Sequence, residues 1–180
     1  MKAEMGVLIL TGMPGAGKEE LVTIALALGY QVQRMGDVVR AEAVRNGVPP
    51  QAVGEFADRE RRSHGYDIWA KRTVPLVGEG DTLIDGCRSM AEVNVFRQAF
   101  GGHVKVVAVH SAPSTRFPRL VARGRPDAPR DRREFEERDR RELGWGLGDT
   151  IALADLMLVN EATLEDFHRD ARSLLMELRG

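Results

Sequence analysis

Cysteine, histidine and long apolar runs are scarce in this sequence, and each shortage excludes a class of site or protein. The one cysteine, Cys87, cannot form a disulfide or a cysteine-based metal site within one chain. The four histidines lie far apart without the spacing of metal ligands, so no zinc site is expected. No apolar run approaches the roughly 18 residues of a membrane-spanning helix, and residues 1–6 carry no leader of a charged and then an apolar segment. We expect a cytoplasmic enzyme with no membrane partner.

Lysine is also rare, because 22 of the 26 basic residues are arginine. Arginine favours planar contacts with anions such as carboxylates and phosphates. Basic and acidic side chains almost cancel to a net charge of -1, which predicts no nucleic-acid surface. Neither repeats nor linkers divide the chain, so we expect one domain over residues 1–180. The sequence does not predict the oligomeric state.

The stretch from Met5 to Glu20 has the layout of a phosphate-binding loop. Residues 7–11 are apolar or β-branched, as in a buried parallel strand, and an apolar helical pattern begins at Leu21. Between them, the spacing Gly-x-x-x-x-Gly-Lys turns backbone N–H groups toward one anion and brings a lysine to its β- and γ-phosphates. A glycine-rich turn that binds nothing is the alternative, and the complete motif favours a phosphate site. The predicted loop residues are Gly12, Met13, Pro14, Gly15, Ala16, Gly17, Lys18 and Glu19.

One feature of this loop concerns the metal ion that accompanies ATP. Glu19 stands where a serine or threonine usually supplies a hydroxyl group to Mg²⁺, and Glu20 follows it. Asp85 ends another predicted strand, where its carboxylate can hold Mg²⁺ directly or through water. We therefore expect ATP and Mg²⁺ as cofactors. Asp85, water and phosphate oxygens would hold the ion, more weakly than usual.

Short apolar runs alternate with helical patterns along the whole chain. Strands are expected over residues 7–11, 30–35, 81–85, 104–109 and 155–159. Helices are expected after the loop and over residues 37–45, 50–64, 66–77, 89–100, 113–123, 131–143 and 163–178. Asp37 is expected to cap the first of these seven helices. The alternation predicts an α/β fold with a three-layer, doubly wound, five-stranded parallel sheet.

Two regions contain more than the sheet requires. Residues 36–78 are helical without a strand, although a single crossover helix can join parallel strands, so this insertion has a task of its own. Residues 116–142 hold ten arginines and seven carboxylates, and the helix over 131–143 is charged on all sides. We expect an arginine-rich lid over about residues 123–143, followed by a flexible joint at 144–148. The alternative is a solvated, salt-bridged helical hairpin.

Further motifs follow the phosphate loop in a fixed order: Gly36-Asp37-x-x-Arg40, Asp85-Gly86-x-Arg88 and Arg119-Leu120-x-x-Arg123. Together with the loop they resemble the nucleoside monophosphate kinases, adenylate kinase above all. The ending Ala154-Asp155-x-x-x-Val159-Asn160 resembles that of dephospho-coenzyme A kinase. Over essentially the whole chain, the sequence is similar to an archaeal P-loop family related to adenylate kinase. That family shares Met35 to Arg40, Arg138-Asp139-x-Arg141-Glu142-Leu143 and Gly146-Leu147-Gly148.

The resemblance implies a P-loop nucleotide kinase fold and a role for each matching residue. Arg40 and Arg88 would hold the phosphate of a small nucleotide acceptor, with Gly36, Asp37 and Gly86 beside them and residues 36–78 forming the acceptor-binding region. Arg119 and Arg123 would stabilise the transferred phosphoryl group, because fixed guanidinium groups can meet the charge on its equatorial oxygens. Arg138 and Arg141 match the far side of the lid.

The sequence departs from adenylate kinase where the acceptor base is read. Asp85 and Arg88 are separated by two residues instead of three, and Glu92 replaces a glutamine that reads adenine. A carboxylate accepts hydrogen bonds only, so Glu92 could pair with an exocyclic amine or with the N1–H and N2–H₂ edge of guanine. It could equally be a first-turn carboxylate of the helix that begins near Ser89.

Three functions fit these motifs. The first is an ATP-dependent nucleoside monophosphate kinase, which needs no general base because its acceptor is already an anion. The second is a hydroxyl kinase like dephospho-coenzyme A kinase, with Asp37 as the base. The third is a slow ATPase that acts as a switch or assembly factor. Trp69 and Trp145 could stack on a base, although filling apolar space is their more common role.

Overall fold

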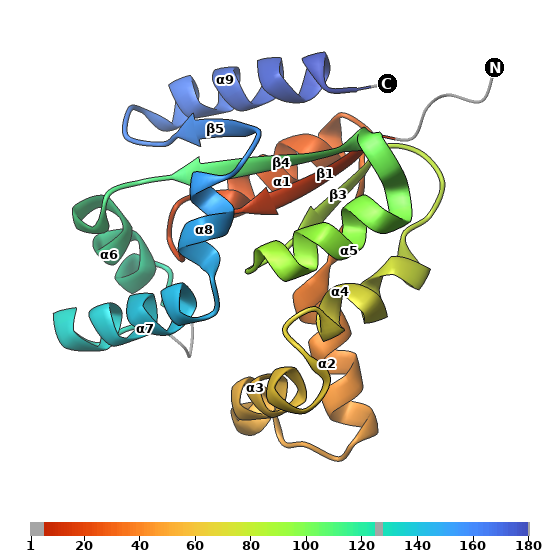
Figure 1. Ribbon diagram of the computed structural model, residues 1–180. Helices are drawn as coiled ribbons and strands as arrows, with labels where there is room; N and C mark the ends of the chain where they lie inside the picture. The colour runs from red at the N-terminus through yellow and green to blue at the C-terminus, as the bar shows by residue number, and fades with distance from the viewer. Residues whose placement is uncertain (1–5, 125–127, 180) are drawn as a thin grey trace.

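The structure, a computed structural model, describes residues 6–124 and 128–179. Five strands form one sheet in the order β2-β3-β1-β4-β5, and every pairing is parallel. The strands are β1 (Val7–Thr11), β2 (Gln31–Arg34), β3 (Thr82–Asp85), β4 (Val104–His110) and β5 (Leu156–Val159). Helices cover both faces of this sheet (Figure 1), which confirms the doubly wound α/β fold predicted from the sequence.

Alternate residues of β1 face the two helical layers. Leu8 and Leu10 pack in one cluster with α1 (Lys18–Ala27) and α9 (Leu164–Glu177). Val7 and Ile9 pack in a second cluster, which includes α5 (Met90–Phe100). All four side chains are at most 1% exposed. Burial on both faces explains why four consecutive residues of this strand, Val7 to Leu10, are apolar instead of every second one.

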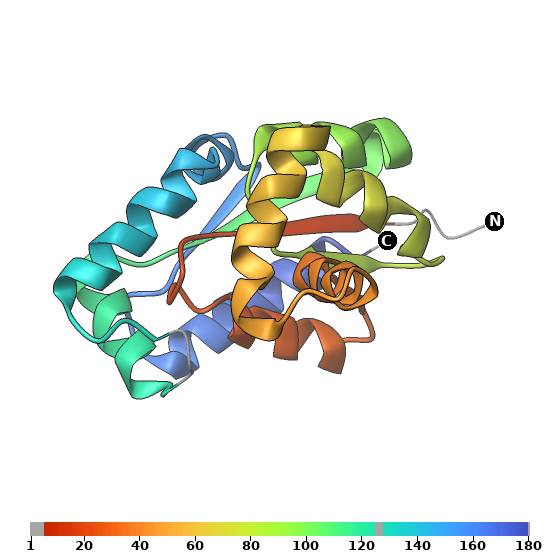
Figure 2. The ribbon, with the colours of Figure 1, turned by 90° about the horizontal axis from the view of Figure 1, so that it is seen from below.

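Two helical arms leave the carboxyl ends of the strands and frame the phosphate loop. The first arm comprises α2 (Met35–Arg45), η1 (Pro50–Ala52), α3 (Val53–His64), α4 (Ile68–Thr73) and η2 (Val74–Leu76). The second arm comprises α6 (Pro113–Ala122) and α7 (Arg132–Gly144). The view from below shows the loop after β1 between α3 and α7 (Figure 2). The remaining helices are η3 (Gly101–His103) and α8 (Leu147–Ala152). Part of the predicted lid, residues 125–127, lies outside the described residues.

The first arm corrects one prediction about Asp37. Helix α2 begins at Met35, with Arg34 at its N-cap and no side-chain cap hydrogen bond. Asp37 therefore lies inside the first turn, where its negative charge still interacts favourably with the helix dipole. Its carboxylate forms an exposed ion pair with Arg40 instead of a cap.

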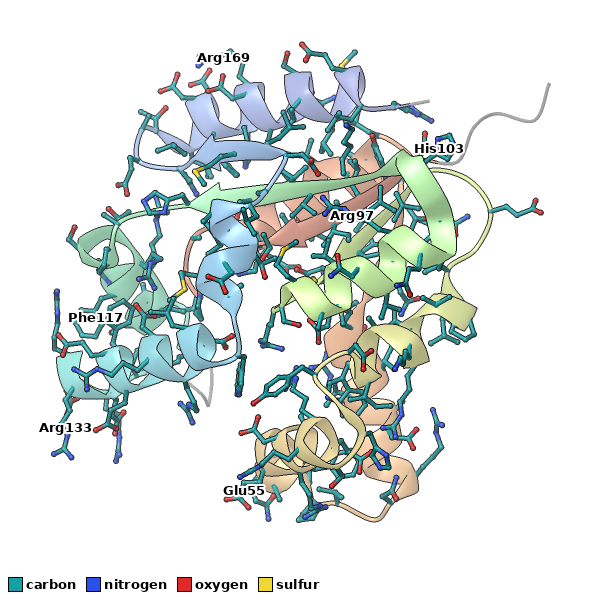
Figure 3. All side chains as sticks on the ribbon, in the orientation of Figure 1. Glu55, Arg97, His103, Phe117, Arg133 and Arg169 are labelled. Carbon is teal, nitrogen blue, oxygen red and sulfur yellow. The ribbon has the colours of Figure 1, made fainter. Side chains whose placement is uncertain are left out.

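The second arm corrects the prediction that its last helix is charged on all sides. Phe135 of α7 is 1% exposed, and its ring lies 5.4 Å from that of Phe117 on α6. Phe117 lies on the side of α6 that faces α7, whereas Arg133 points away from the helix (Figure 3). This aromatic pair, together with the ion pair between Arg116 and Asp139, anchors a helix whose other residues are mostly charged.

The glycine-rich stretch 144–148, predicted to be a flexible joint, forms a tight turn between two helices. Gly144 ends α7, and α8 begins at Leu147, whose side chain is 2% exposed. Gly146 adopts φ 96°, a left-handed conformation that suits glycine. Within the described ranges, no helix is long and apolar enough to cross a membrane.

Candidate active site

A cleft of about 330 Å³ lies at the carboxyl ends of the strands, between the two arms. This is the edge of a parallel α/β sheet where ligands generally bind. Five glycines line it: Gly12, Gly15, Gly17, Gly36 and Gly86. Its charged lining consists of Lys18, Glu19, Arg34, Arg40, Asp85, Arg88, Arg123, Arg138 and Glu142. The phosphate loop and most of the predicted arginines therefore face one space.

The phosphate loop requires glycine at two positions for different reasons. Gly12 has φ 143°, and a side chain there would collide with the backbone oxygen of Val109. Gly17 has φ 108°, and a side chain there would collide with the amide of Asn160. That amide donates to the carbonyl of Ala16 at 2.9 Å. The loop is thus tied to β4 and to the residue after β5, and its shape is set before any ligand binds.

Lys18 is the first residue of α1 and points back over the loop. Its ammonium group donates to the carbonyl oxygens of Gly12 (2.5 Å) and Met13 (3.2 Å). Burial lowers the pKa of Lys18 to about 8, although the negative charges of Asp85 and Glu142 act in the opposite direction. A bound phosphate group would give the ammonium group of Lys18 a partner with a full negative charge, whereas the two carbonyl oxygens carry only partial charges.

Glu19 and Asp85 lie on either side of an arginine that the sequence analysis did not single out. Arg34 donates to both carboxylate oxygens of Glu19, at 2.6 and 2.9 Å, and to Asp85 at 3.3 Å. Arg34 and Asp85 occupy paired positions at the ends of β2 and β3, which brings their side chains to one face of the sheet. An arginine at the end of a short, partly exposed strand carries no distinguishing sequence signal.

The carboxylate of Asp85 fits the prediction that it holds Mg²⁺. Burial raises the pKa of Asp85, while the charges of Lys18 and Arg34 oppose that shift. One of its oxygens, Oδ1, is buried and has no hydrogen-bond partner among the described residues. A buried, unpaired carboxylate oxygen beside a phosphate loop is a suitable ligand for a hard cation. Within the described ranges, no cluster of three or more acidic, histidine or cysteine residues forms a metal site by itself.

Arg40 and Arg88 approach the cleft from different elements, as the sequence predicted. Arg40 of α2 lines the cleft, close to the backbone of Gly36. Arg88 follows Gly86, which also lines the cleft and adopts φ 98°. The guanidinium group of Arg88 donates to Glu142 at 2.8 Å and lies 5.3 Å from the ring centre of Trp145.

Glu92 does not line the cleft. Its position therefore favours the role of a first-turn helix carboxylate over that of a group that reads the acceptor base. Its side chain is fully buried, and its carboxylate accepts the backbone N–H of Arg88 at 2.7 Å. Ser89 caps the same helix by accepting from the backbone N–H of Glu92. Burial raises the pKa of Glu92, and the nearby charge of Arg61 opposes that shift. Glu92 is therefore placed to hold the loop that carries Arg88, and it is not accessible to a base in this structure.

The four arginines predicted to act in catalysis, two for the transferred phosphoryl group and two on the far side of the lid, divide differently in the structure. Arg123 and Arg138 line the cleft. Arg119 donates instead to the hydroxyl group of Ser111 (3.1 Å) and the carbonyl of Asn160 (3.2 Å), and Arg141 lines neighbouring hollows outside the cleft. The structure thus brings Arg123 and Arg138 to the phosphate loop and leaves Arg119 and Arg141 beside it.

Arg116 joins the second arm to the loop, a role that sequence reasoning did not identify. It is 3% exposed, donates to Asp139 of α7 at 2.6 and 2.9 Å, and reaches the carbonyl of Pro14 at 3.1 Å. Its spacing to Arg119 and Arg123 shows that these residues share a helix face. Spacing alone does not reveal which residue of that face is buried.

Comparison with known proteins agrees with this architecture. The family described as an AAA domain matches residues 11–136. A UPF0200 protein from Thermoplasma acidophilum is 45% identical over 174 residues, covering 95% of this chain and 96% of its own. The UPF0200 protein from Hyperthermus butylicus is 45% identical, and the match covers 97% of this chain and 95% of that protein. The UPF0200 protein from Methanopyrus kandleri is 46% identical, and the match covers 97% of this chain and 91% of that protein.

Solved structures with this fold are more distant in sequence. TT1252 from Thermus thermophilus has a TM-score of 0.68 at 18% identity, with 98% of this chain and 100% of that chain covered. A gluconokinase from Sinorhizobium meliloti has a TM-score of 0.62 at 15% identity, with 98% and 95% covered. A shikimate kinase from Acinetobacter baumannii, in complex with shikimate, has a TM-score of 0.61 at 15% identity, with 97% and 90% covered. These similarities establish a P-loop kinase-like fold.

Proposed function

The chain belongs to the UPF0200 family of archaeal proteins, and we propose that it transfers a phosphoryl group from ATP to a small nucleotide acceptor, as nucleoside monophosphate kinases do. One observation supports this proposal above the others. Arg40, Arg88, Arg123 and Arg138 line the same cleft as the phosphate loop. Four guanidinium groups exceed what one triphosphate needs, since Lys18 and the loop N–H groups already provide for it. They suit a second anion opposite the first.

In this proposal each group has a task that its position allows. The loop and Lys18 hold the β- and γ-phosphates of ATP. Arg40 and Arg88 hold the acceptor phosphate on the side of the first arm. Arg123 and Arg138 meet the charge that develops on the equatorial oxygens of the transferred group. Asp85 would hold Mg²⁺ when the ion is bound, and the chemistry supplied there would be partial neutralisation of the phosphate charge.

A kinase of hydroxyl groups requires a carboxylate that accepts the proton of the substrate. Asp37, the candidate for that role, does not line the cleft, and its side chain is 60% exposed in an ion pair with Arg40. The acceptor phosphate of a nucleotide needs no such base, because its oxygen is already an anion at neutral pH. The position of Asp37 therefore supports a phosphate acceptor over a hydroxyl acceptor.

The proposal is tested by a coupled assay of ATP with AMP, GMP, CMP, UMP and dephospho-coenzyme A. We expect one or more of the nucleoside monophosphates to stimulate ADP formation and to appear as a diphosphate. Phosphorylation of dephospho-coenzyme A alone would replace the proposal with a hydroxyl kinase. Slow ATP hydrolysis that no acceptor changes would replace it with a nucleotide-dependent switch.

A pair of arginine variants makes the assay specific for the cleft. Arg88→Lys keeps the charge but loses the planar fork of the guanidinium, so we expect turnover to fall about 100-fold. Arg97→Lys is the matched control, because Arg97 pairs with Asp155 at 3.5 Å and does not line the cleft. Equal losses in both variants would contradict the role assigned to Arg88.

A further inference from the structure

Arg34 lies outside the phosphate-loop motif, yet its guanidinium group contacts carboxylates on the loop helix and on β3. It is the last residue of β2 and the N-cap of α2, and it lies opposite Asp85 in the strand register. Its fork meets both oxygens of Glu19, at 2.6 and 2.9 Å. One of the same two nitrogens also donates to Asp85 at 3.3 Å. A single guanidinium group thus bridges Glu19 and Asp85, two of the three carboxylates that line the cleft.

The negative charge of Glu19 beside the phosphate loop requires a counter-ion. Glu19 stands where a neutral hydroxyl group is usual, so the loop carries an additional negative charge close to the site of a triphosphate. At a distance of about 4 Å, two like charges near a protein surface repel with roughly 4 kcal/mol. The bidentate contact with Arg34 neutralises Glu19 and keeps its carboxylate in one orientation.

We propose that Arg34 is a resident counter-ion of the cleft, clamped there by Glu19, and that it competes with a divalent cation for Asp85. This inference rests on the proposed phosphate site and concerns how that site balances its charge. Asp85 offers a buried oxygen without a hydrogen-bond partner among the described residues, which suits a hard cation. The guanidinium group on its other oxygen repels that cation. Binding of a divalent cation without nucleotide is therefore weak in the native protein.

Removing Arg34 should expose a metal site that does not require nucleotide. The probe is Mn²⁺ alone, titrated into nucleotide-free protein and followed by electron paramagnetic resonance of the free ion. In Arg34→Met the carboxylates of Glu19 and Asp85 lose their shared counter-ion, so we expect Mn²⁺ affinity to rise about tenfold or more. In the double variant Glu19→Gln/Arg34→Met one carboxylate is lost, so most of that gain should disappear.

Arg45→Met is the matched control for net charge. Arg45 lies on α2 and pairs with Glu42 at 2.8 Å, but neither residue lines the cleft. Mn²⁺ affinity should stay at the native value in this variant. An equal rise in Arg45→Met, or no rise in Arg34→Met, would overturn the inference. If Arg34→Met does not fold, Arg34→Gln removes the charge while keeping a donor to Glu19, and the same two results decide.

The two assays together distinguish failure of the kinase proposal from failure of the counter-ion inference. If no nucleotide is phosphorylated but Mn²⁺ affinity rises in Arg34→Met, the counter-ion inference stands and the kinase proposal fails. If a nucleotide is phosphorylated but Mn²⁺ affinity does not change in Arg34→Met, the kinase proposal stands and the counter-ion inference fails.

Discussion

The half of the molecule around the phosphate loop and the two helical arms are stabilised by different interactions. In β1, α1 and α9 the buried side chains are apolar except for that of Thr11; examples are Leu8, Leu21 and Leu175, each at most 1% exposed. The arms and their junctions bury charged groups as well, namely Arg61, Arg116 and Glu142 at 5%, 3% and 7% exposed. Apolar burial fixes the first region, whereas the arms combine apolar burial, for example of Phe56 and Trp69, with ion pairs of buried charged groups.

This difference matters for a protein that binds anions. A close-packed apolar core has no interaction that a phosphate could replace. An ion pair such as that of Arg88 with Glu142, at 2.8 Å, is made of the same groups that a phosphate would compete for. We therefore expect the phosphate loop to keep its shape on binding and the arms to exchange their ion pairs for contacts with the ligand.

The largest effect is expected at Lys18, the cation that the phosphate loop and α1 contribute to the cleft. Lys18→Met should lower turnover about 10³-fold, because the lysine meets charge that no other loop residue can reach. Stability at pH 7 should not fall, since the variant removes a buried ammonium group that makes contact only with carbonyls and carboxylates at a distance. Steady-state kinetics and urea unfolding measure the two effects separately.

The pH dependence of the same variant has a defined sign. Burial lowers the pKa of Lys18 from 10.5 to about 8. Between these values the unfolded chain binds the proton and the folded protein does not, so the stability that Lys18 contributes rises with pH across that window. The free energy of unfolding of the native protein, relative to Lys18→Met, should increase by roughly 3 kcal/mol from pH 8 to 10.5. Lys71→Met, which removes an exposed lysine paired with Asp67, should show no such increase.

The region of β1, the phosphate loop and α1 is also the part of the fold that the sequence predicted well. The run Val7 to Thr11 and the glycines after it identify the strand and the loop, because burial on both faces and the spacing of the motif leave little freedom. Arg34, Glu142 and Arg116 were missed or left without a role because their partners are 15, 54 and 23 residues away in the chain. Such pairings depend on how elements distant in the sequence pack together, and no local pattern encodes them.

The correction concerning α7 and the choice between the two predicted roles of Glu92 have the same origin. Phe135 is the one aromatic residue of α7 and does not make a periodic apolar face, yet its contact with Phe117 helps to hold the helix in place. Glu92 has the residue type of a base-reading group, but tertiary packing buries it behind Arg88. Residue type and spacing indicated where the site lies. They could not indicate which charged groups face the ligand and which support them.

The next effect concerns the stability of the second arm. Arg116→Met should leave Asp139 without a partner at 15% side-chain exposure and lower the free energy of unfolding by about 3 kcal/mol. Arg133→Met is the matched control in the same arm, because Arg133 pairs with Glu137 at 3.0 Å but is 86% exposed. It should leave stability nearly unchanged. Equal changes in the two variants, measured by urea unfolding, would show that burial of Arg116 is not what holds the arm.

The smallest effect is expected at Asp37, which lies in the first arm but outside the cleft lining. Asp37→Asn removes one charge of an exposed ion pair with Arg40 and should change stability by less than about 0.5 kcal/mol. Turnover with the best nucleotide acceptor should stay within about twofold, because a phosphate acceptor requires no base. Asp85→Asn, in the cleft, serves as the contrasting variant and should impair turnover strongly. A collapse of turnover in Asp37→Asn with normal unfolding would instead identify Asp37 as a general base and the acceptor as a hydroxyl group.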